Sequence, residues 1–250
     1  MKKPVFYFKN MHKNRLNKNR GYNIVVFDCD STLTKIEGVD ELAKLKGKKR
    51  KVALLTKRTQ NGDLSFNKAL TERLNMIRPT QKDMDWLGRQ YIKNVVPGAK
   101  KLIIELRKRR IKTCIVSGGY SEAVNVFAKY LGVPNKNVFA IDLKFDKNGN
   151  YLGFDGQNPL AKDNGKSRVL RSFSRKGKIL FVGDGVTDLE AKNVVDLFIG
   201  FGGVIKRQIV KENADVFITN LLDIPKLCFT IETSNLLPIL KIVQKGRKIC

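Results

Sequence analysis

The sequence contains very little histidine. His12 is the single histidine in 250 residues, and it lies in a basic, asparagine-rich leader. A Ser-His-Asp triad, a histidine-ligated zinc site or a phosphohistidine intermediate needs a histidine in the folded part of the chain. None is present there, so these mechanisms are excluded, and any general acid or base must be a carboxylate, a lysine, a tyrosine or a cysteine.

Paired cysteines and long apolar stretches are also missing. The four cysteines, Cys29, Cys114, Cys228 and Cys250, lie far apart and form no CxxC motif, which indicates free thiols in a reducing compartment. There is no apolar run of about 18 residues, the length that a membrane span needs. The apolar run near the start is shorter than the roughly 7 to 15 residues of a secretory signal. We therefore expect a cytoplasmic protein, with an organellar presequence in residues 1–21 as the alternative.

Negative charge is scarce relative to positive charge. The chain has 23 Asp and Glu against 49 Lys and Arg, a net charge of +26. The densest basic runs are GKKRK at 47–51 and RKRR at 107–110, and neither is interleaved with the aromatic residues that single-strand nucleic-acid binding usually requires. The charge therefore favours solvated basic surfaces, and binding of nucleic acid or an anionic surface is the alternative function from a different class.

Short apolar runs alternate with helical patterns from Tyr22 onward. Five runs, bounded by Gly, Asp or Ser, are typical of strands in a parallel sheet covered on both faces: 23–28, 111–118, 178–184, 196–203 and 214–219. Amphipathic patterns predict helices at 97–110, 121–132, 166–176 and 187–194. This alternation predicts an α/β fold with a doubly wound parallel sheet.

Two segments interrupt the alternation. Residues 37–96 contain no convincing strand, and their helical patterns at 64–77 and 81–92 predict an inserted helical cap, because ordinary connections have about 4 to 6 residues. Asn148-Gly149, between alternating strands, predicts a β-hairpin insertion at about 139–155. The expected division is a basic, weakly ordered extension (1–21), a core (22–36 and 97–228), a cap (37–96) and a tail (229–250). The pattern of the tail favours a last core helix, and an amphipathic helix on a membrane or a partner is the alternative.

Polar residues follow three of the predicted strands. The first strand leads into Asp28-Cys29-Asp30, the second into Ser117-Gly118-Gly119, and the third into GDGVTD, residues 183–188. Lys166 opens the helix that leads into the third strand. Ligands of open α/β sheets bind beyond the carboxyl ends of the strands, so these residues are expected to converge in one crevice.

The residue types in this crevice suit phosphoryl transfer. Crowded carboxylates cannot all stay ionised unaided, and a bound Mg²⁺ relieves their repulsion. Ser117, the neighbouring backbone N–H groups and Lys166 supply donors for a phosphate. We interpret Asp28 as the nucleophile and Asp30 as its acid/base partner. Each motif alone has an ordinary explanation as a turn or a helix cap, so the prediction depends on their combination in this order.

Several motifs resemble, in order and spacing, the haloacid dehalogenase superfamily and, within it, the phosphoserine phosphatase family: FDCDST, EGVDELAK, FNKALTERL, VSGGY, NVFAIDLKF, GDGVTD and FIGFGG. The similarity extends over most of the chain, from about residue 23 to 219. It implies a Rossmann-like core, an aspartyl-phosphate on Asp28 and proton transfer by Asp30. It also implies Mg²⁺ held by Asp28, the backbone carbonyl of Asp30 and Asp184, with Asp188 steadying the set.

The resemblance also assigns substrate-binding residues. Glu37 and Arg73 would bind the ammonium and carboxylate of a phosphorylated amino acid, since Arg pairs well with a carboxylate and Glu with an ammonium. Taken without the resemblance, both would be ordinary helix residues. Phe66 would lie either in the pocket wall or in the core of the cap. The remaining implied substrate-binding residues are Ser117, Gly118, Gly119, Lys166, Thr187 and Arg207.

The implied function is Mg²⁺-dependent hydrolysis of L-phosphoserine, the last step of serine synthesis. The alternative among enzymes is a related phosphatase that acts on another small phosphorylated metabolite. The expected binding partner is a small phosphorylated amino acid, and a homodimer is the protein assembly considered.

Overall fold

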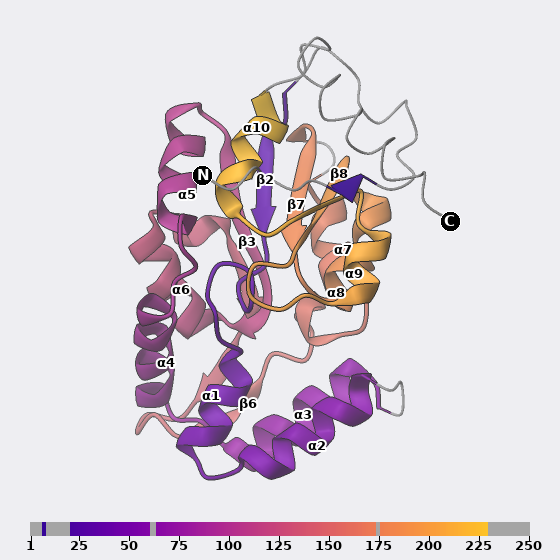
Figure 1. Cartoon of the computed structure of the whole chain (residues 1–250). Helices are drawn as coiled ribbons and strands as arrows, with labels where there is room; N and C mark the ends of the chain where they lie inside the picture. The colour runs from indigo at the N-terminus through magenta and orange to yellow at the C-terminus, as the bar shows by residue number, and fades with distance from the viewer. Residues whose placement is uncertain (1–6, 9–20, 61–63, 174–175, 230–250) are drawn as a thin grey trace, which may run out of the picture.

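The computed structural model describes residues 7–8, 21–60, 64–173 and 176–229. They form a seven-stranded sheet with helices on both sides, a further group of helices at one end and a separate two-stranded hairpin (Figure 1). The strands, in spatial order, are β1 (Tyr7–Phe8), β9 (Val216–Ile218), β8 (Leu197–Phe201), β7 (Ile179–Gly183), β2 (Ile24–Phe27), β3 (Lys112–Tyr120) and β4 (Val138–Ile141). All neighbours are parallel except β1, which is antiparallel to β9. The predicted doubly wound α/β fold is confirmed.

The centre of the sheet is built from uninterrupted apolar sequence. β2, β7 and β8 are buried along their whole length, as expected for parallel strands with helices on both faces. Phe27, the last residue of β2, lies opposite Ile115 of β3 and Val182 of β7. The order of the strands reverses at β2, because the chain adds β3 and β4 on one side of it and then β7, β8 and β9 on the other. That reversal creates a crevice at the carboxyl ends of β2, β3 and β7.

Two layers of helices flank the sheet. In Figure 1, α5 (Ala99–Lys108) and α6 (Ser121–Leu131) lie on one side, and α7 (Gly165–Arg171), α8 (Val186–Leu189) and α9 (Gln208–Asn213) lie on the other. The short helix α10 (Ile224–Phe229) ends the described chain. α7 ends at Arg171, before the predicted end at 176, and the hydroxyl of the following Ser172 donates to the carbonyl of Val169 at 2.7 Å. α8 is also shorter than predicted, and a 3₁₀ turn at Lys192–Val194 follows it.

The described residues between 38 and 93, which leave out 61–63, form four helices: α1 (Gly38–Leu45), α2 (Lys49–Gln60), α3 (Phe66–Ile77) and α4 (Gln81–Lys93). α1, α2 and α3 lie beyond the carboxyl end of β2, whereas α4 packs along α6 (Figure 1). α4 begins at a capping box between Thr80 and Asp83, which satisfies free N–H groups of its first turn. An isolated antiparallel bridge between Thr34 and Val95 joins the two ends of this insert. The division of the chain into a cap and a core stays a prediction.

The prediction of a weakly ordered extension over residues 1–21 is wrong for Tyr7 and Phe8. These two residues pair with Phe217 and Val216 of β9 and form the edge of the sheet. A strand of two residues is too short to show an alternating pattern, so it leaves no periodic signal in the sequence.

The predicted hairpin at about 139–155 is also wrong in its first part. Val138–Ile141 forms β4, which joins the main sheet parallel to β3. The hairpin itself consists of β5 (Leu143–Phe145) and β6 (Tyr151–Phe154). The predicted turn is in place, because Gly149 has a φ of +80°, a conformation that glycine adopts easily. The sequence pattern merged two consecutive strands because only Asp142 separates them.

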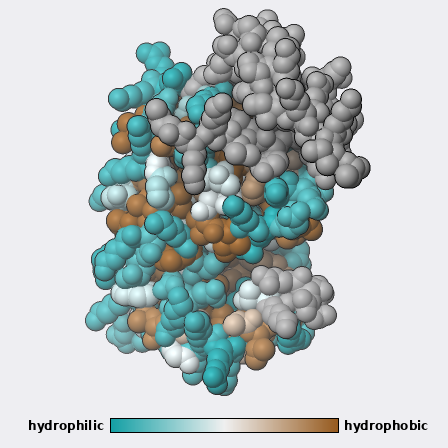
Figure 2. Space-filling model, in the orientation of Figure 1, coloured by the Kyte–Doolittle hydropathy of each residue, from teal (hydrophilic) through white to brown (hydrophobic). Residues whose placement is uncertain are grey.

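The face shown in Figure 2 carries many hydrophilic residues, in line with the excess of lysine and arginine, with hydrophobic patches between them. No helix within the described ranges is long and apolar enough to cross a bilayer. Cys29 and Cys114 are free and buried, as predicted. The predicted tail helix falls in residues 230–250 and lies outside the described residues.

Candidate active site

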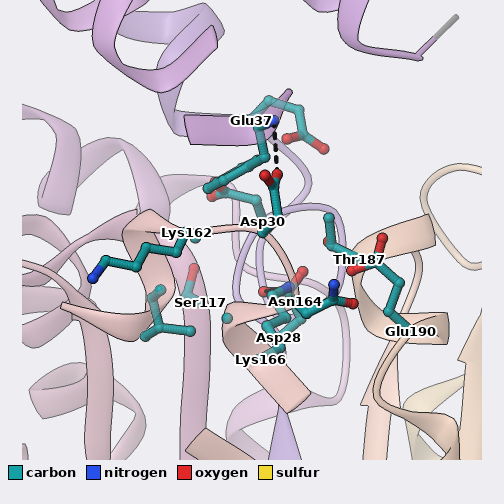
Figure 3. Close-up of a pocket in the computed structure, with 14 residues that line it drawn as sticks. Asp28, Asp30, Glu37, Ser117, Lys162, Asn164, Lys166, Thr187 and Glu190 are labelled. Atoms are coloured by element: carbon teal, nitrogen blue, oxygen red, sulfur yellow. Dashed lines mark hydrogen bonds and ion pairs between the residues drawn. The ribbon is translucent and has the colours of Figure 1, made fainter. Parts of the chain in front are cut away.

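The carboxyl ends of β2, β3 and β7 surround a pocket with a volume of about 170 Å³ (Figure 3). Asp28 follows β2, Ser117 lies in β3, and Lys166 lies in the first turn of α7. This volume is below the roughly 300–1,000 Å³ of pockets for drug-sized ligands, so it suits a small metabolite.

The structure brings the predicted site residues together, although not all of them line the pocket. The lining contains these predicted residues: Asp28, Asp30, Glu37, Phe66, Ser117, Gly118, Lys166 and Thr187. Five others lie behind this wall or beside it: Arg73, Gly119, Asp184, Asp188 and Arg207. Arg73 is on α3, partly buried and close enough to Glu37 and Asp40 for electrostatic interaction.

Lys166 is the central cation of the site. Its Nζ lies 2.9 Å from Oδ1 of Asp28 and 2.6 Å from Oδ1 of Asp188, and all three side chains are at most 10% exposed. Burial alone would lower the pKa of Lys166, but Asp188 and Asp28 outweigh it and raise the pKa. Asp188 also accepts from the N–H of Gly185 at 2.9 Å. A Cβ on Gly183 would lie 2.3 Å from Cγ of Asp188, so the close approach of this carboxylate to β7 requires glycine.

Asp184 is the third carboxylate of this cluster, beside Asp28 and Asp188. Thr32 donates to its Oδ1 at 3.0 Å, and Nε of Arg207 lies 3.3 Å from its Oδ2. Carboxylate oxygens of Asp28, Asp184 and Asp188 lie within 4.8 Å of one another. Lys166 pairs with Asp28 and Asp188, and Arg207 pairs with Asp184, so two cations face three buried carboxylates and the site has too little positive charge.

The pKa values of these carboxyl groups reflect the same shortage of positive charge. Burial and then the charge of Asp188 raise the pKa of Asp28 well above its ordinary value. The same two causes, in the same order, raise the pKa of Asp184 to about 7. A cluster of hard oxygen donors that is short of positive charge fits a divalent metal ion. Asp28, Asp184 and Asp188 could therefore hold a metal.

We expect the metal-free protein to lose stability as the pH rises from about 5 to about 8. The raised pKa values of Asp28, Asp30 and Asp184 mean that the folded state binds more protons than the unfolded state in this window. Each carboxyl then lowers the free energy of unfolding by up to about 1.4 kcal/mol per pH unit. Chemical denaturation in EDTA at each pH measures the free energy of unfolding. Asp184→Asn should flatten the slope, and a stability that rises over this range would contradict the electrostatic account.

Asp30 lies between Asp28 and the start of α1 (Figure 3). Burial and then the nearby Glu37 raise the pKa of Asp30 to about 8. Ser31 donates to Oε1 of Glu37 at 2.6 Å, and Nη2 of Arg207 lies 3.8 Å from the same oxygen. A carboxyl with this pKa is protonated at neutral pH and can act as a general acid.

Donors for an anion lie opposite these acids. Oγ of Ser117 accepts from the N–H of Gly119 at 2.9 Å, which leaves the O–H of Ser117 able to donate into the pocket. Nζ of Lys166 lies beside Asp28 on the same side. Acceptors for a metal next to donors for an anion are the combination that phosphoryl transfer uses.

Helix α3 closes one side of the pocket through two hydrogen bonds. The N–H of Phe66, in the first turn of α3, donates to Oδ1 of Asp163 at 3.0 Å. The side chain of Asn67 donates to the carbonyl of Ala161 at 2.7 Å. A Cβ on Gly118 would lie 3.5 Å from the ring of Phe66, so this ring lies over the end of β3. Of the two positions foreseen for Phe66, the pocket wall is confirmed.

Sequence reasoning missed the loop that precedes α7 and the end of α8. Both contribute residues to the lining: Leu160, Lys162, Asp163, Asn164, Gly165 and Glu190. The pair Asn164-Gly165 was the available signal, because Asn in a left-handed conformation (φ +57°) commonly marks a turn before a helix. Glu190 follows Asp188 by two residues and has no signal of its own.

The fold and the site together match a known class of enzymes. The model of the haloacid dehalogenase-like hydrolases matches residues 22–194. The chain therefore belongs to the haloacid dehalogenase-like hydrolase family.

Several of the proteins similar to this chain are phosphoserine phosphatases. The chain is 41% identical to phosphoserine phosphatase of Mus musculus over 203 residues, which cover 80% of this chain and 90% of the mouse protein. It is 37% identical to the chloroplastic phosphoserine phosphatase of Arabidopsis thaliana, over 80% of this chain and 69% of the plant protein. A solved structure of a phospho-aspartyl intermediate analogue of phosphoserine phosphatase superimposes with a TM-score of 0.71 at 28% identity, and covers 83% of this chain and 99% of that one. The resemblance predicted from the motifs is confirmed.

Proposed function

We propose that this protein hydrolyses the phosphate ester of L-phosphoserine through a phosphorylated Asp28. The observation that carries the proposal is the arrangement of Asp28 and Asp184 at adjoining strand ends, with Lys166 of α7 beside Asp28, in a chain similar to phosphoserine phosphatases. The similar solved structure is of a phospho-aspartyl intermediate analogue, and a phosphorylated aspartate is the species proposed here.

In the proposed reaction, a carboxylate oxygen of Asp28 attacks phosphorus and the bond to the serine oxygen breaks. Asp30 gives its proton to that leaving oxygen. Water then attacks the phosphorus of the aspartyl-phosphate, and the ionised Asp30 takes a proton from the water. Free phosphate leaves, and both carboxyl groups return to their starting states.

Ser117, Gly118 and Lys166 hold the phosphate oxygens, with Thr187 at the same wall. Lys166 also stabilises the ionised form of Asp28. Asp28, the backbone carbonyl of Asp30 and Asp184 would hold Mg²⁺, with Asp188 fixed beside them by Lys166. When bound, the ion supplies positive charge that offsets the repulsion between carboxylates and phosphate.

The amino-acid part of the substrate would extend toward α1 and α3. Glu37 reaches the pocket from the start of α1 and would accept the ammonium group (Figure 3). Arg73 and Arg207 would bind the carboxylate. Nε of Arg73 is buried and has no hydrogen-bond partner among the described residues, so it keeps a free donor.

We expect Arg73→Ala to raise KM for phosphoserine by about 10- to 100-fold, because a charge-assisted bond to the substrate carboxylate contributes about 1.5–3 kcal/mol. KM for phosphoethanolamine, which has the ammonium group but no carboxylate, should change much less. Arg78→Ala, an exchange at the left-handed residue that ends α3, controls for general damage to the helix. Equal changes in KM for both substrates would show that Arg73 does not bind the substrate carboxylate.

Phosphate release from a panel of phosphomonoesters, with and without Mg²⁺, tests the function as a whole. We expect release from phosphoserine to exceed release from sugar phosphates and to require the metal. If the enzyme prefers another small phosphomonoester, the proposed phosphatase chemistry stands and only the proposed substrate is wrong. Activity without a divalent metal would overturn the proposed metal site. We also propose a cytoplasmic location, which cell fractionation tests. We propose a homodimer as well, which light scattering tests.

A steep salt dependence of DNA or RNA binding would instead favour the alternative function of a basic surface.

A further inference from the structure

Tyr91 of α4 is a buried tyrosine whose hydroxyl lies behind the pocket. A Cβ on Gly38 would lie 2.1 Å from the Tyr91 hydroxyl oxygen, and a Cβ on Gly119 would lie 3.4 Å from it. Gly38 begins α1 next to Glu37, and Gly119 donates to Ser117. The hydroxyl therefore sits between the two backbone segments that carry the proposed substrate-binding groups.

Two buried polar atoms at this place are not fully hydrogen-bonded. Within the described ranges, the Tyr91 hydroxyl and Oδ1 of Asp30 are both buried and neither makes a hydrogen bond of full geometry, although the two side chains lie close enough to interact. Buried polar atoms are almost always paired, so each such atom needs an explanation. The N–H of Gly38 reaches the Asp30 carboxyl, and a Cβ on the same Gly38 would meet the Tyr91 hydroxyl, so the two side chains are neighbours. A donor and an acceptor with unused capacity thus lie next to each other.

We propose that Tyr91 is a positioning residue, whose hydroxyl donates to Oδ1 of Asp30 and fixes the orientation of that carboxyl for proton transfer. The N–H of Gly38 donates to the Asp30 carboxyl, and Oδ1 has no partner there, so Tyr91 and Gly38 hold different oxygens. Each carboxyl oxygen can accept twice, so the group can still carry the transferred proton. The inference rests on the acid/base role of Asp30 in the proposed function.

The test compares two substrates in Tyr91→Phe, which removes only the hydroxyl. The full-length protein with Mg²⁺ is mixed rapidly with phosphoserine or with 4-nitrophenyl phosphate, whose leaving group needs no protonation. With phosphoserine, the rate of the first turnover should fall by about tenfold, a part of the contribution of a positioned acid. With 4-nitrophenyl phosphate, the rate of the first release of nitrophenol should stay within about twofold, and KM for both substrates should be unchanged.

Tyr130→Phe is the matched control, because it removes a tyrosine hydroxyl from α6 and keeps the ring that lies against Lys100. It should leave both rates unchanged. A fall of equal size for the two substrates, a rise in KM, or no change in Tyr91→Phe would overturn the positioning role. If Tyr91→Phe does not fold, replacement of tyrosine by 3-fluorotyrosine keeps the side-chain shape and makes the hydroxyl more acidic. A change in the first-turnover rate with phosphoserine but not with 4-nitrophenyl phosphate then supports the positioning role. First-turnover rates equal to those of the unlabelled protein overturn it.

Asp28→Asn separates this inference from the proposed function. If the wild type releases no phosphate, or if Asp28→Asn keeps its activity, the proposed function fails. If Asp28→Asn is inactive while Tyr91→Phe shows no selective loss, only the positioning role fails.

Discussion

Replacement of Asp28 by Asn is expected to reduce kcat for phosphate release by about 10⁴-fold or more, because the nucleophile of a covalent mechanism is lost. An asparagine at this position has nearly the same shape as aspartate but no nucleophilic carboxylate oxygen. The change also removes one of the repelling carboxylates, so the variant should be at least as stable as the wild type in EDTA. Thermal unfolding checks the fold, and steady-state kinetics with Mg²⁺ measure the loss.

Asp163→Asn is the matched control for this prediction. It makes the same chemical change in the same pocket wall, at a carboxylate that accepts from Phe66 and has no role in the proposed chemistry. Its kcat should fall by less than about tenfold. Trapping by acid quench should reveal a phosphorylated aspartate in the wild type and none in Asp28→Asn. A loss of about 10²-fold or less in Asp28→Asn would be too small for a covalent nucleophile.

Lys166→Met is expected to lower both stability and activity. The lysine is the buried cation between Asp28 and Asp188, and its removal leaves these carboxylates without their partner. Loss of one partner of a buried ion pair costs about 3–5 kcal/mol. The free energy of unfolding in EDTA should therefore fall by an amount of this order. Phosphate release should fall by about 10²-fold or more, since an electrostatic contact to the reacting phosphate is lost.

Added Mg²⁺ distinguishes this electrostatic cause from a simple packing defect. A metal bound near Asp28 and Asp184 would supply the missing positive charge, so Mg²⁺ should raise the stability of Lys166→Met more than that of the wild type. Lys162→Met is the control, because Lys162 lines the same pocket and its Nζ lies 3.3 Å from Gln157 rather than beside a carboxylate of the cluster. Equal effects of the two substitutions would show that Lys166 has no special role.

The sheet and the acidic strand ends could be predicted from the sequence for one shared reason. Buried parallel strands need uninterrupted apolar runs, and Asp28, Ser117 and Asp184 interrupt such runs or end them. The order of the chain through a doubly wound sheet then brings these interruptions to one edge. The role of Glu37 and Arg73 came from the family resemblance alone, since the same residues are ordinary in an amphipathic helix.

Other parts of the site have no such signal. Tyr91 fits the apolar stripe of α4, and only the three-dimensional structure shows that its hydroxyl lies beside Asp30. Lys162 and Asp163 enter the pocket because the loop before α7 turns there, and loop paths depend on contacts between segments far apart in sequence, such as Phe66 with Asp163. The two-residue strand β1 was missed because it is too short for a periodic pattern and because its partner β9 lies more than 200 residues away.

Strand β1 has a consequence for the behaviour of the protein in concentrated solution. Tyr7 and Phe8 cover the open side of β9, whose backbone groups would otherwise be ready to pair with another chain. An exposed parallel edge of apolar residues such as Val216, Phe217 and Ile218 is a template for intermolecular sheet growth. We therefore expect loss of this pairing to make the edge of the sheet more prone to join another chain, a consequence separate from the site at the carboxyl ends of the central strands.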